Sequence, residues 1–270
     1  RFHETALELG KNAEKHEAEE ASCVKVDGIE ISGNSELIAF TQNETSTGAA
    51  QPVEDIYKTK ERYPGKLIAV DVVSTLPYIN LDYSKIDTAF FSVQKGFGLP
   101  AGLGVWLVNE KCIEKASNLL KDGRNIGTYH SLTSLLSKGV KNQTPETPNV
   151  LGIYLLAKIC EDMLDKGIAQ VRRETDYKAA VLYNAISNNS LLSPFVKEES
   201  YRSKTVIVVE TTIPSQKIIK KLEEKGIIIG SGYGPYKEKH LRIANFPTHS
   251  KEKTEQLADM LEGITKEQFD

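Results

Sequence analysis

The feature that most constrains the fold is an alternation of short apolar runs with stretches of helical pattern. The apolar runs have the length of strands and are rich in Val, Ile, Leu and Phe, which favours strands buried on both faces. The predicted strands are Leu37–Phe40, Leu67–Val70, Thr88–Val93 and Gly104–Val108, and the predicted helices are Val53–Tyr63 and Glu110–Lys121. The alternation indicates the α/β class, with a mostly parallel sheet sandwiched by helices.

The second half of the chain has a different order of predicted helices and strands. Residues 141–149 contain two prolines and are expected to form a loop, and a long helix is expected over Val150–Asn188. After it come predicted strands at Thr205–Glu210, Ile227–Ile229 and His240–Phe246, and predicted helices at Ser215–Lys225 and Ser250–Leu261. We therefore expect a large α/β domain over residues 1–165 and a smaller α+β domain over residues 166–270.

The first ten residues have apolar side chains at helical spacing and end at Gly10. No N-cap residue precedes this segment, and the chain does not begin with Met. We therefore expect a fragment of a longer protein.

The composition excludes several classes of protein. With 34 basic and 37 acidic side chains and a net charge of −3, the chain has no electrostatic footprint for nucleic acid. No stretch approaches the ~18–20 apolar residues of a membrane span, and no signal peptide opens the chain, so a cytoplasmic location is expected. Cys23, Cys112 and Cys160 are far apart, which fits reduced thiols and argues against a zinc site. We expect no nucleic acid, membrane or metal ion as a partner.

Polar side chains follow three of the predicted strands where each strand ends. Residues 43–48 bring hydroxyl groups, Asp71 follows the second strand, and Lys95 follows the third, 24 positions after Asp71. Each alone has an ordinary interpretation, as a turn, a helix cap or a surface lysine. Ligands of open α/β sheets bind beyond the carboxyl ends of the strands. An acid and a lysine there have the layout that holds a pyridoxal ring, with the acid at the ring nitrogen and the lysine in a Schiff base.

Four segments carry a resemblance to a known family: NETSTG, AVDVVSTLP, FFSVQKGFGLPAGLG and NQTPETPN. Together they resemble the class V aminotransferases of fold type I, closest to the phosphoserine and the alanine- or serine-glyoxylate aminotransferases. The resemblance covers most of the chain and implies pyridoxal 5′-phosphate as cofactor. It also implies a seven-stranded, mostly parallel sheet with a small C-terminal domain.

The resemblance implies roles for individual residues at the cofactor. Lys95 corresponds to the lysine that binds the cofactor covalently, and Asp71 corresponds to the acid that pairs with the ring nitrogen. Thr45 corresponds to the residue at the phenolic side of the ring, and Gln94 lies near the cofactor phosphate.

Two further implications concern the partner subunit and the substrate. The family's loop around Gln143 and Thr144, with Thr147 as a weaker candidate, reaches the phosphate in the other subunit, which implies a homodimer with shared sites. Arg242 corresponds to the arginine that holds the substrate carboxylate, a role that suits a planar guanidinium.

The sequence differs from the family pattern at positions that bind the substrate, so more than one substrate is compatible with it. The phosphate-binding loop and the aromatic residue that stacks on the ring correspond to positions before Arg1. The His-Arg pair that helps bind phosphoserine is absent from Gly234–His240, where Lys237, Lys239 or His240 are the possible substitutes. We expect an aminotransferase that uses a small amino acid and an oxo acid, with phosphoserine and 2-oxoglutarate, in serine biosynthesis, as the first choice. An alanine- or serine-glyoxylate aminotransferase is the alternative.

Three other functions fit the sequence less well. Gly96–Ala101 matches the dinucleotide motif G-x-G-x-x-A, but Pro100 and a strand follow where a helix should begin. A cysteine desulfurase would have Ser-x-His-Lys, whereas this chain has Ser-Val-Gln-Lys at residues 92–95. A non-catalytic scaffold of the same fold has no physical reason to keep Asp71 together with Lys95 and Arg242.

Overall fold

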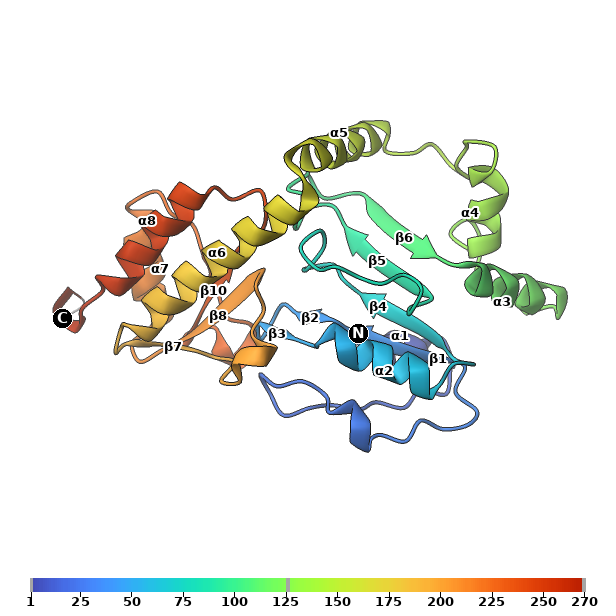
Figure 1. Cartoon of the computed structure of the whole chain (residues 1–270), viewed down its shortest axis with the longest axis horizontal. Coiled ribbons are helices and arrows are strands. Elements are labelled where there is room, and N and C mark those ends of the chain that lie inside the picture. Colours follow the sequence, from blue (N-terminus) through green and yellow to red (C-terminus); the bar gives the residue numbers. More distant parts are fainter. Residues whose placement is uncertain (1, 125–126, 269–270) are drawn as a thin grey trace.

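The computed structural model describes residues 2–124 and 127–268. Figure 1 shows two sheets in different parts of the molecule, with α6 extending from the end of α5 across the second sheet. The helices are α1 (Phe2–Glu8), α2 (Val53–Arg62), α3 (Glu110–Lys121), α4 (Leu132–Gly139), α5 (Val150–Lys166), α6 (Ile168–Ser187), α7 (Ser215–Glu223) and α8 (Lys251–Glu262). The strands are β1 (Leu37–Thr41), β2 (Asn43–Glu44), β3 (Ala49–Ala50), β4 (Leu67–Asp71), β5 (Thr88–Ser92), β6 (Gly104–Val108), β7 (Leu192–Pro194), β8 (Val206–Thr211), β9 (Gly230–Ser231) and β10 (His240–Ala244).

The first sheet has the strand order β1-β4-β5-β6, and β2 and β3 form a separate hairpin directly after β1. The pairs β1–β4 and β4–β5 are parallel, whereas β6 is antiparallel to β5, so the expectation of a mostly parallel sheet is confirmed. The described residues contribute four strands to this sheet and not the seven that the resemblance implied. Asp71, the last residue of β4, stands in register between Thr41 of β1 and Phe90 of β5. The parallel strands therefore end at one edge, where the loops after β1, β4 and β5 meet.

One face of the first sheet is packed under helices. Residues of α2 and α5 join the buried side chains of β1, β4 and β5 in one core, which includes Ile56, Ile68, Val70, Phe91, Leu156 and Met163. On the opposite face the ring of Phe2 from α1 meets Phe90 edge-on, with 5.5 Å between the centroids. Leu37 and Trp106 remain 49% and 47% exposed, so this face is covered less completely.

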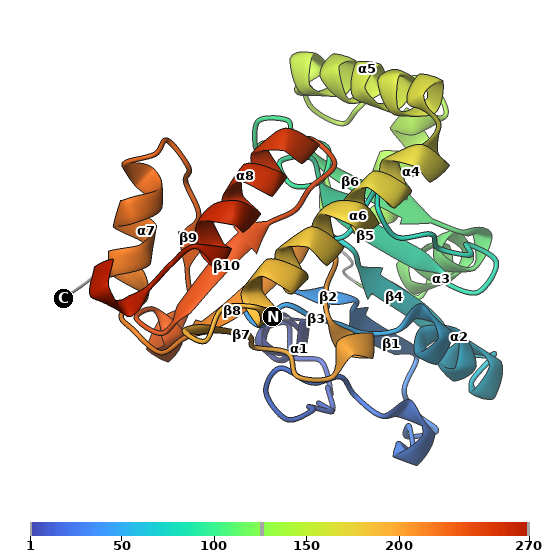
Figure 2. The same cartoon turned by 60° about the vertical axis from the view of Figure 1, so that its left-hand side comes forward.

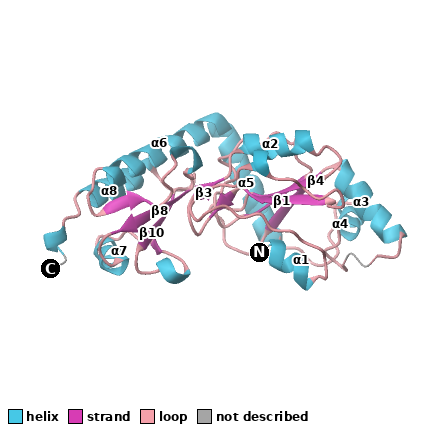
Figure 3. Cartoon of the chain, turned by 90° about the horizontal axis from the view of Figure 1, so that it is seen from below, coloured by secondary structure: helices cyan, strands magenta, loops and turns pink. Residues whose placement is uncertain are grey.

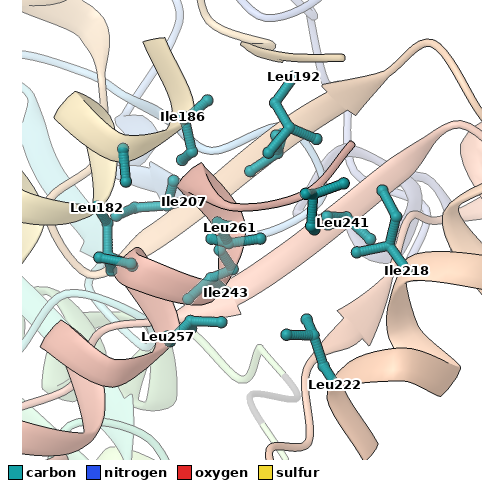
Figure 4. Close-up of a cluster of buried hydrophobic side chains, with 14 of the residues drawn as sticks. Leu182, Ile186, Leu192, Ile207, Ile218, Leu222, Leu241, Ile243, Leu257 and Leu261 are labelled. Atoms are coloured by element: carbon teal, nitrogen blue, oxygen red, sulfur yellow. The ribbon is translucent and has the colours of Figure 1, made fainter. Parts of the chain in front are cut away.

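The second sheet has the order β7-β8-β10-β9, and all of its pairs are antiparallel. Helices α6, α7 and α8 pack on one face and bury a core that Figure 4 shows in close-up. Figure 2 shows α8 lying alongside α6 on this sheet. Along β10 side chains alternate between faces, so Leu241 and Ile243 enter the core while Arg242 lies on the opposite face.

Most of the predicted elements are confirmed within a few residues, but two are wrong. The helix expected over Val150–Asn188 is two helices, because Gly167 adopts a φ of +86° and ends α5 before α6 begins. The strand expected at Ile227–Ile229 is absent, since pairing with β10 begins only at Gly230, which is opposite Arg242. The sequence patterns also missed α4 and β7.

The break at Gly167 separates two helices that belong to different cores. Leu156, Ile159 and Met163 of α5 pack against the first sheet, whereas Leu182 and Ile186 of α6 pack against the second. Seen from below, the molecule is long, with α7 and α8 towards one end and α3 and α4 at the other (Figure 3). A domain boundary at residues 165 and 166 stays a prediction, and this packing favours it.

Candidate functional site

Asp71 lies at the centre of the edge where the parallel strands end. One oxygen of its half-buried carboxylate, Oδ1, accepts a hydrogen bond from the backbone N–H of Val73 at 2.9 Å. Its other oxygen, Oδ2, has no hydrogen-bond partner among the described residues. Burial raises the pKa of Asp71, the Val73 N–H opposes that change, and the charge of Glu44 raises the pKa further. A positively charged group beside Oδ2 would stabilise the ionised form.

Lys95 lies in a tight turn directly after β5. The N–H of Gly98 donates to the carbonyl of Lys95 at 2.9 Å, and Gly98 has a φ of +65°. The turn presses against the loop after β4, because a Cβ on Gly96 would lie 2.0 Å from the carbonyl oxygen of Leu76. The half-buried amine of Lys95 has no hydrogen bond or ion pair within residues 2–124 and 127–268. It is therefore available to a ligand at the same edge as Asp71.

Thr45 and Gln94 lie in the loops that flank these two residues. Thr45 is half-buried in the turn between β2 and β3. Just before β2, the backbone N–H of Gln42 donates to the carbonyl of Asp71 at 3.0 Å. Gln94 precedes Lys95 and is exposed. Neither side chain has a hydrogen bond in the described part of the chain. The structure thus brings Thr45, Asp71, Gln94 and Lys95 to one edge of the sheet.

The second sheet closes against this edge at two glycines. At Gly48 a Cβ would lie 3.1 Å from Cγ2 of Val208, and the carbonyl of Gly48 accepts the N–H of Ser203 at 2.9 Å. At Gly98 a Cβ would lie 2.4 Å from Cγ2 of Thr248, in the loop after β10. The turn of the β2–β3 hairpin therefore touches β8, and the turn after β5 touches the loop after β10, the strand that carries Arg242.

Arg242 lies on the face of the second sheet that receives Gly48. It is paired with Val208 of β8 on one side and with Gly230 of β9 on the other. Its guanidinium carbon lies 3.9 Å from the centre of the Tyr233 ring. The guanidinium has no ion pair or hydrogen bond among the residues that the structure describes, so its N–H groups are available to an anion.

Gln143 and Thr144 are not brought to this edge within one chain. Both are exposed in the segment between α4 and α5, which Figure 1 shows on the outer side of the molecule. The Thr144 hydroxyl donates to the carbonyl of Glu146, and Thr147 is also exposed. No contact joins any of the three to Asp71 or Lys95 in the described ranges.

A buried polar network near the site was not predicted from the sequence. Asn43 donates to the Ser74 hydroxyl at 2.8 Å, and the Thr205 hydroxyl donates to the Ser74 carbonyl at 2.6 Å. These contacts join the loops after β1 and β4 to the start of β8. Asn43 and Ser74 stand within the NETSTG and AVDVVSTLP segments, but only the fold shows that they meet each other and Thr205.

The possible substitutes for a phosphate-binding pair differ in their surroundings. His240 is buried, and its ring stacks on Tyr236 with 4.6 Å between centroids, so it does not face solvent. Lys237 and Lys239 are exposed. A cavity of about 1070 Å³ is lined by parts of residues 2–36, by β1 and by α2, and its lining also includes Glu44, Ser46 and Thr47 but not Asp71 or Lys95.

The described residues contain no cluster of His, Cys, Asp or Glu suited to a metal ion. In the same ranges no helix is both long and apolar enough to cross a bilayer.

The fold and the edge residues together define a class of protein: a two-sheet α/β protein with a lysine and a carboxylate where adjacent parallel strands end. The family model described as Aminotransferase class-V matches residues 6–254, and the chain belongs to this family. The fold type I architecture is confirmed by a phosphoserine aminotransferase from Cytophaga hutchinsonii. That structure is 45% identical with a TM-score of 0.95, over 98% of this chain and 73% of that one.

Two other relatives are more distant. The phosphoserine aminotransferase of Rhodococcus opacus is 27% identical over 235 residues, which are 86% of this chain and 62% of that protein. An alanine–glyoxylate aminotransferase from Nostoc has a TM-score of 0.74 and 25% identity, over 84% of this chain and 61% of that one. The chain spans about three fifths of the length of the curated relatives that it matches.

Proposed function

We propose that this chain carries the central catalytic residues of a pyridoxal 5′-phosphate-dependent aminotransferase, which moves an amino group between a small amino acid and an oxo acid. The observation that carries the proposal is that the unpaired amine of Lys95 and the carboxylate of Asp71 lie at the ends of neighbouring parallel strands. Arg242, which has an unpaired guanidinium, lies on the face of the second sheet that meets the same edge.

The residues at the edge fit this cofactor. When bound, it supplies an aldehyde that reacts with amino groups and a ring that withdraws electrons from the carbon bearing the substrate nitrogen. Lys95 offers a free amine for the aldehyde, and Oδ2 of Asp71 offers an unpaired acceptor for a protonated ring nitrogen. Thr45 and Gln94 would hold the ring in its orientation.

Each residue of the chain then has a defined task. Lys95 would hold the cofactor through Nζ, and the same amine would accept and return the proton of the substrate α-carbon. Asp71 would pair through its free Oδ2 with the ring nitrogen, and that positive charge would favour its ionised form. Arg242 binds the substrate carboxylate through two parallel N–H donors.

Phosphoserine and 2-oxoglutarate, in serine biosynthesis, are our first choice of substrates, because the relatives at 45% and 27% identity are named as phosphoserine aminotransferases. Amino acids paired with glyoxylate are the second choice. That alternative is favoured by the burial of His240, which removes one of the candidate phosphate ligands. A non-catalytic scaffold of the same fold remains the third interpretation.

We also propose a homodimer in which Gln143 and Thr144 serve the partner's site. The exposed position of both residues, away from Lys95 of their own chain, supports the proposal. Next to them, at the start of α5, four large apolar side chains are exposed: Val150, Leu151, Ile153 and Tyr154. We call these four residues the α5 surface. A second copy of the chain would cover it. A cytoplasmic location stays a prediction.

The proposal is tested by the Lys95→Ala variant together with Lys111→Ala, which changes an exposed lysine of α3. With pyridoxal 5′-phosphate, the wild type and Lys111→Ala, all variants being made in the full-length protein, are expected to develop a yellow absorption band that phosphoserine bleaches. Lys95→Ala should keep its circular dichroism spectrum but lose the band, and transamination should fall by about a thousandfold or more.

Each outcome separates the candidates. Bleaching by alanine or serine that glyoxylate reverses, with no bleaching by phosphoserine, would select the second choice of substrates. A wild type that stays colourless would select the scaffold, and full turnover by Lys95→Ala would refute the role of Lys95.

A further inference from the structure

The guanidinium of Arg242 lies over an aromatic ring. Its carbon is 3.9 Å from the centre of the Tyr233 ring. The guanidinium also lies close to Gly230, the residue paired with Arg242 in β9, because a Cβ there would be 3.3 Å from Nη2 and 3.5 Å from Nε. One face of the guanidinium is therefore covered by the ring, while its N–H groups have no hydrogen-bond partner among the described residues.

The turn between β9 and β10 forces Tyr233 into this position. The N–H of Gly232 donates to the carbonyl of His240 at 2.9 Å, and the N–H of Tyr236 donates to the carbonyl of Tyr233 at 3.0 Å. A Cβ at Gly232 would lie 2.4 Å from the carbonyl oxygen of Tyr236, and Gly234 has a φ of +50°. The close approach at Gly232 and the positive φ of Gly234 both favour glycine in this tight turn beside Arg242.

An arginine side chain is long, and it loses rotamer freedom when it binds a ligand. A stacked ring restricts that freedom in advance and attracts the cation, without using the N–H donors that a carboxylate needs. A carboxylate approaching the N–H edge would find the donors already in place, which lowers the entropy cost of binding.

We propose that Tyr233 is a positioning residue that holds the Arg242 guanidinium for a carboxylate ligand. This inference rests on the proposed role of Arg242. The aromatic ring carries the effect, and the hydroxyl does not. Tyr233 acts on binding in the ground state and the transition state alike, so it affects KM and leaves kcat nearly unchanged.

The test is the binding of maleate, an unreactive dicarboxylate, to the protein loaded with pyridoxal 5′-phosphate, measured by titration calorimetry. Tyr233→Leu is expected to raise the dissociation constant about three- to tenfold, which is the range of a cation–ring contact. Tyr233→Phe should stay within about twofold of the wild type, because the ring is kept.

Arg242→Leu separates this inference from the proposed function. If Arg242→Leu binds maleate as the wild type does, the proposed role of Arg242 is wrong. The role of Tyr233, which depends on it, is then refuted as well. If Arg242→Leu abolishes binding but Tyr233→Leu has no effect, only the inference about Tyr233 is refuted. Equal weakening by Tyr233→Phe and Tyr233→Leu would assign the effect to the hydroxyl and also contradict it.

Steady-state kinetics supply the second readout. In Tyr233→Leu the KM for the oxo acid is expected to rise by the same factor as the maleate dissociation constant, with kcat changed by less than about twofold. A fall in kcat with KM unchanged would show that Tyr233 supports the fold or the chemistry and does not position Arg242.

Discussion

At the scale of single residues, the site depends on positions where a side chain has no room. Gly96 follows Lys95 directly, and a Cβ there would lie 2.0 Å from the Leu76 carbonyl oxygen and 2.8 Å from Cδ of Pro77. Both obstacles belong to the loop after β4, so neither can move without shifting the backbone next to Asp71. The closeness of Gly96 to this loop fixes the distance between the two strand ends.

Gly96→Ala is therefore expected to lower the free energy of unfolding by about 2–3 kcal/mol, the usual cost of forcing extra volume into a packed region. Urea denaturation measures this change. Gly65→Ala is the matched control, because nothing lies within 4 Å of a Cβ at that position and its φ is not positive. The control should be neutral or stabilising by about 0.4–1 kcal/mol. A similar loss in both variants would mean that Gly96 has no special contact.

At the scale of elements, α6 is joined to the loop after β10 by a buried lysine. Lys178 is 2% exposed, and its Nζ donates to the carbonyls of Phe246 and His249 at 2.7 and 2.8 Å. Thr248, which meets the turn after Lys95 at Gly98, lies between these two carbonyls in the chain. Lys178 therefore holds the loop through which the second sheet contacts the first.

This lysine predicts a pH dependence of stability. Burial lowers the pKa of Lys178 from 10.5 to about 8, while the charge of Glu174 opposes that change. Between these two values the unfolded chain binds more protons at Lys178 than the folded chain, so this residue's contribution to stability rises with pH. The free energy of unfolding of the wild type minus that of Lys178→Met should thus increase from pH 8 to 10 in urea titrations. A constant or falling difference would contradict the lowered pKa.

At the scale of the whole molecule, the α5 surface makes a prediction about assembly. Leu151 and Tyr154 are 67% and 57% exposed, and they follow the segment of Gln143 and Thr144. If a second chain covers these side chains, two charges there should prevent association, because burying an unpaired carboxylate is costly.

In sedimentation velocity the wild type is expected to be a dimer and the double variant Leu151→Glu, Tyr154→Glu a monomer. Ile228→Glu is the control, since Ile228 is 84% exposed but lies in the second half of the chain, before β9. It should remain a dimer. A double variant that sediments as the wild type would place the dimer interface elsewhere.

The sequence by itself was enough to predict the strands of the first sheet, most helices and the class of the fold. It was also enough to place Asp71 and Lys95 at strand ends, because the order of elements along the chain puts the ends of parallel strands on one edge. These features depend on local periodicity and chain order, which are properties of neighbouring residues.

Only the tertiary structure decided features that depend on contacts between distant segments. The pattern of α6 places Lys178 on the same stripe as Val171, Thr175 and Leu182, but only the loop after β10 provides the two carbonyls that bind it. Likewise Tyr233 stacks on Arg242 because β9 pairs with β10 from Gly230 and not from Ile227. Contacts and strand registers of this kind depend on packing between segments that are distant in the chain. A short window of sequence does not include both partners, so it cannot predict them.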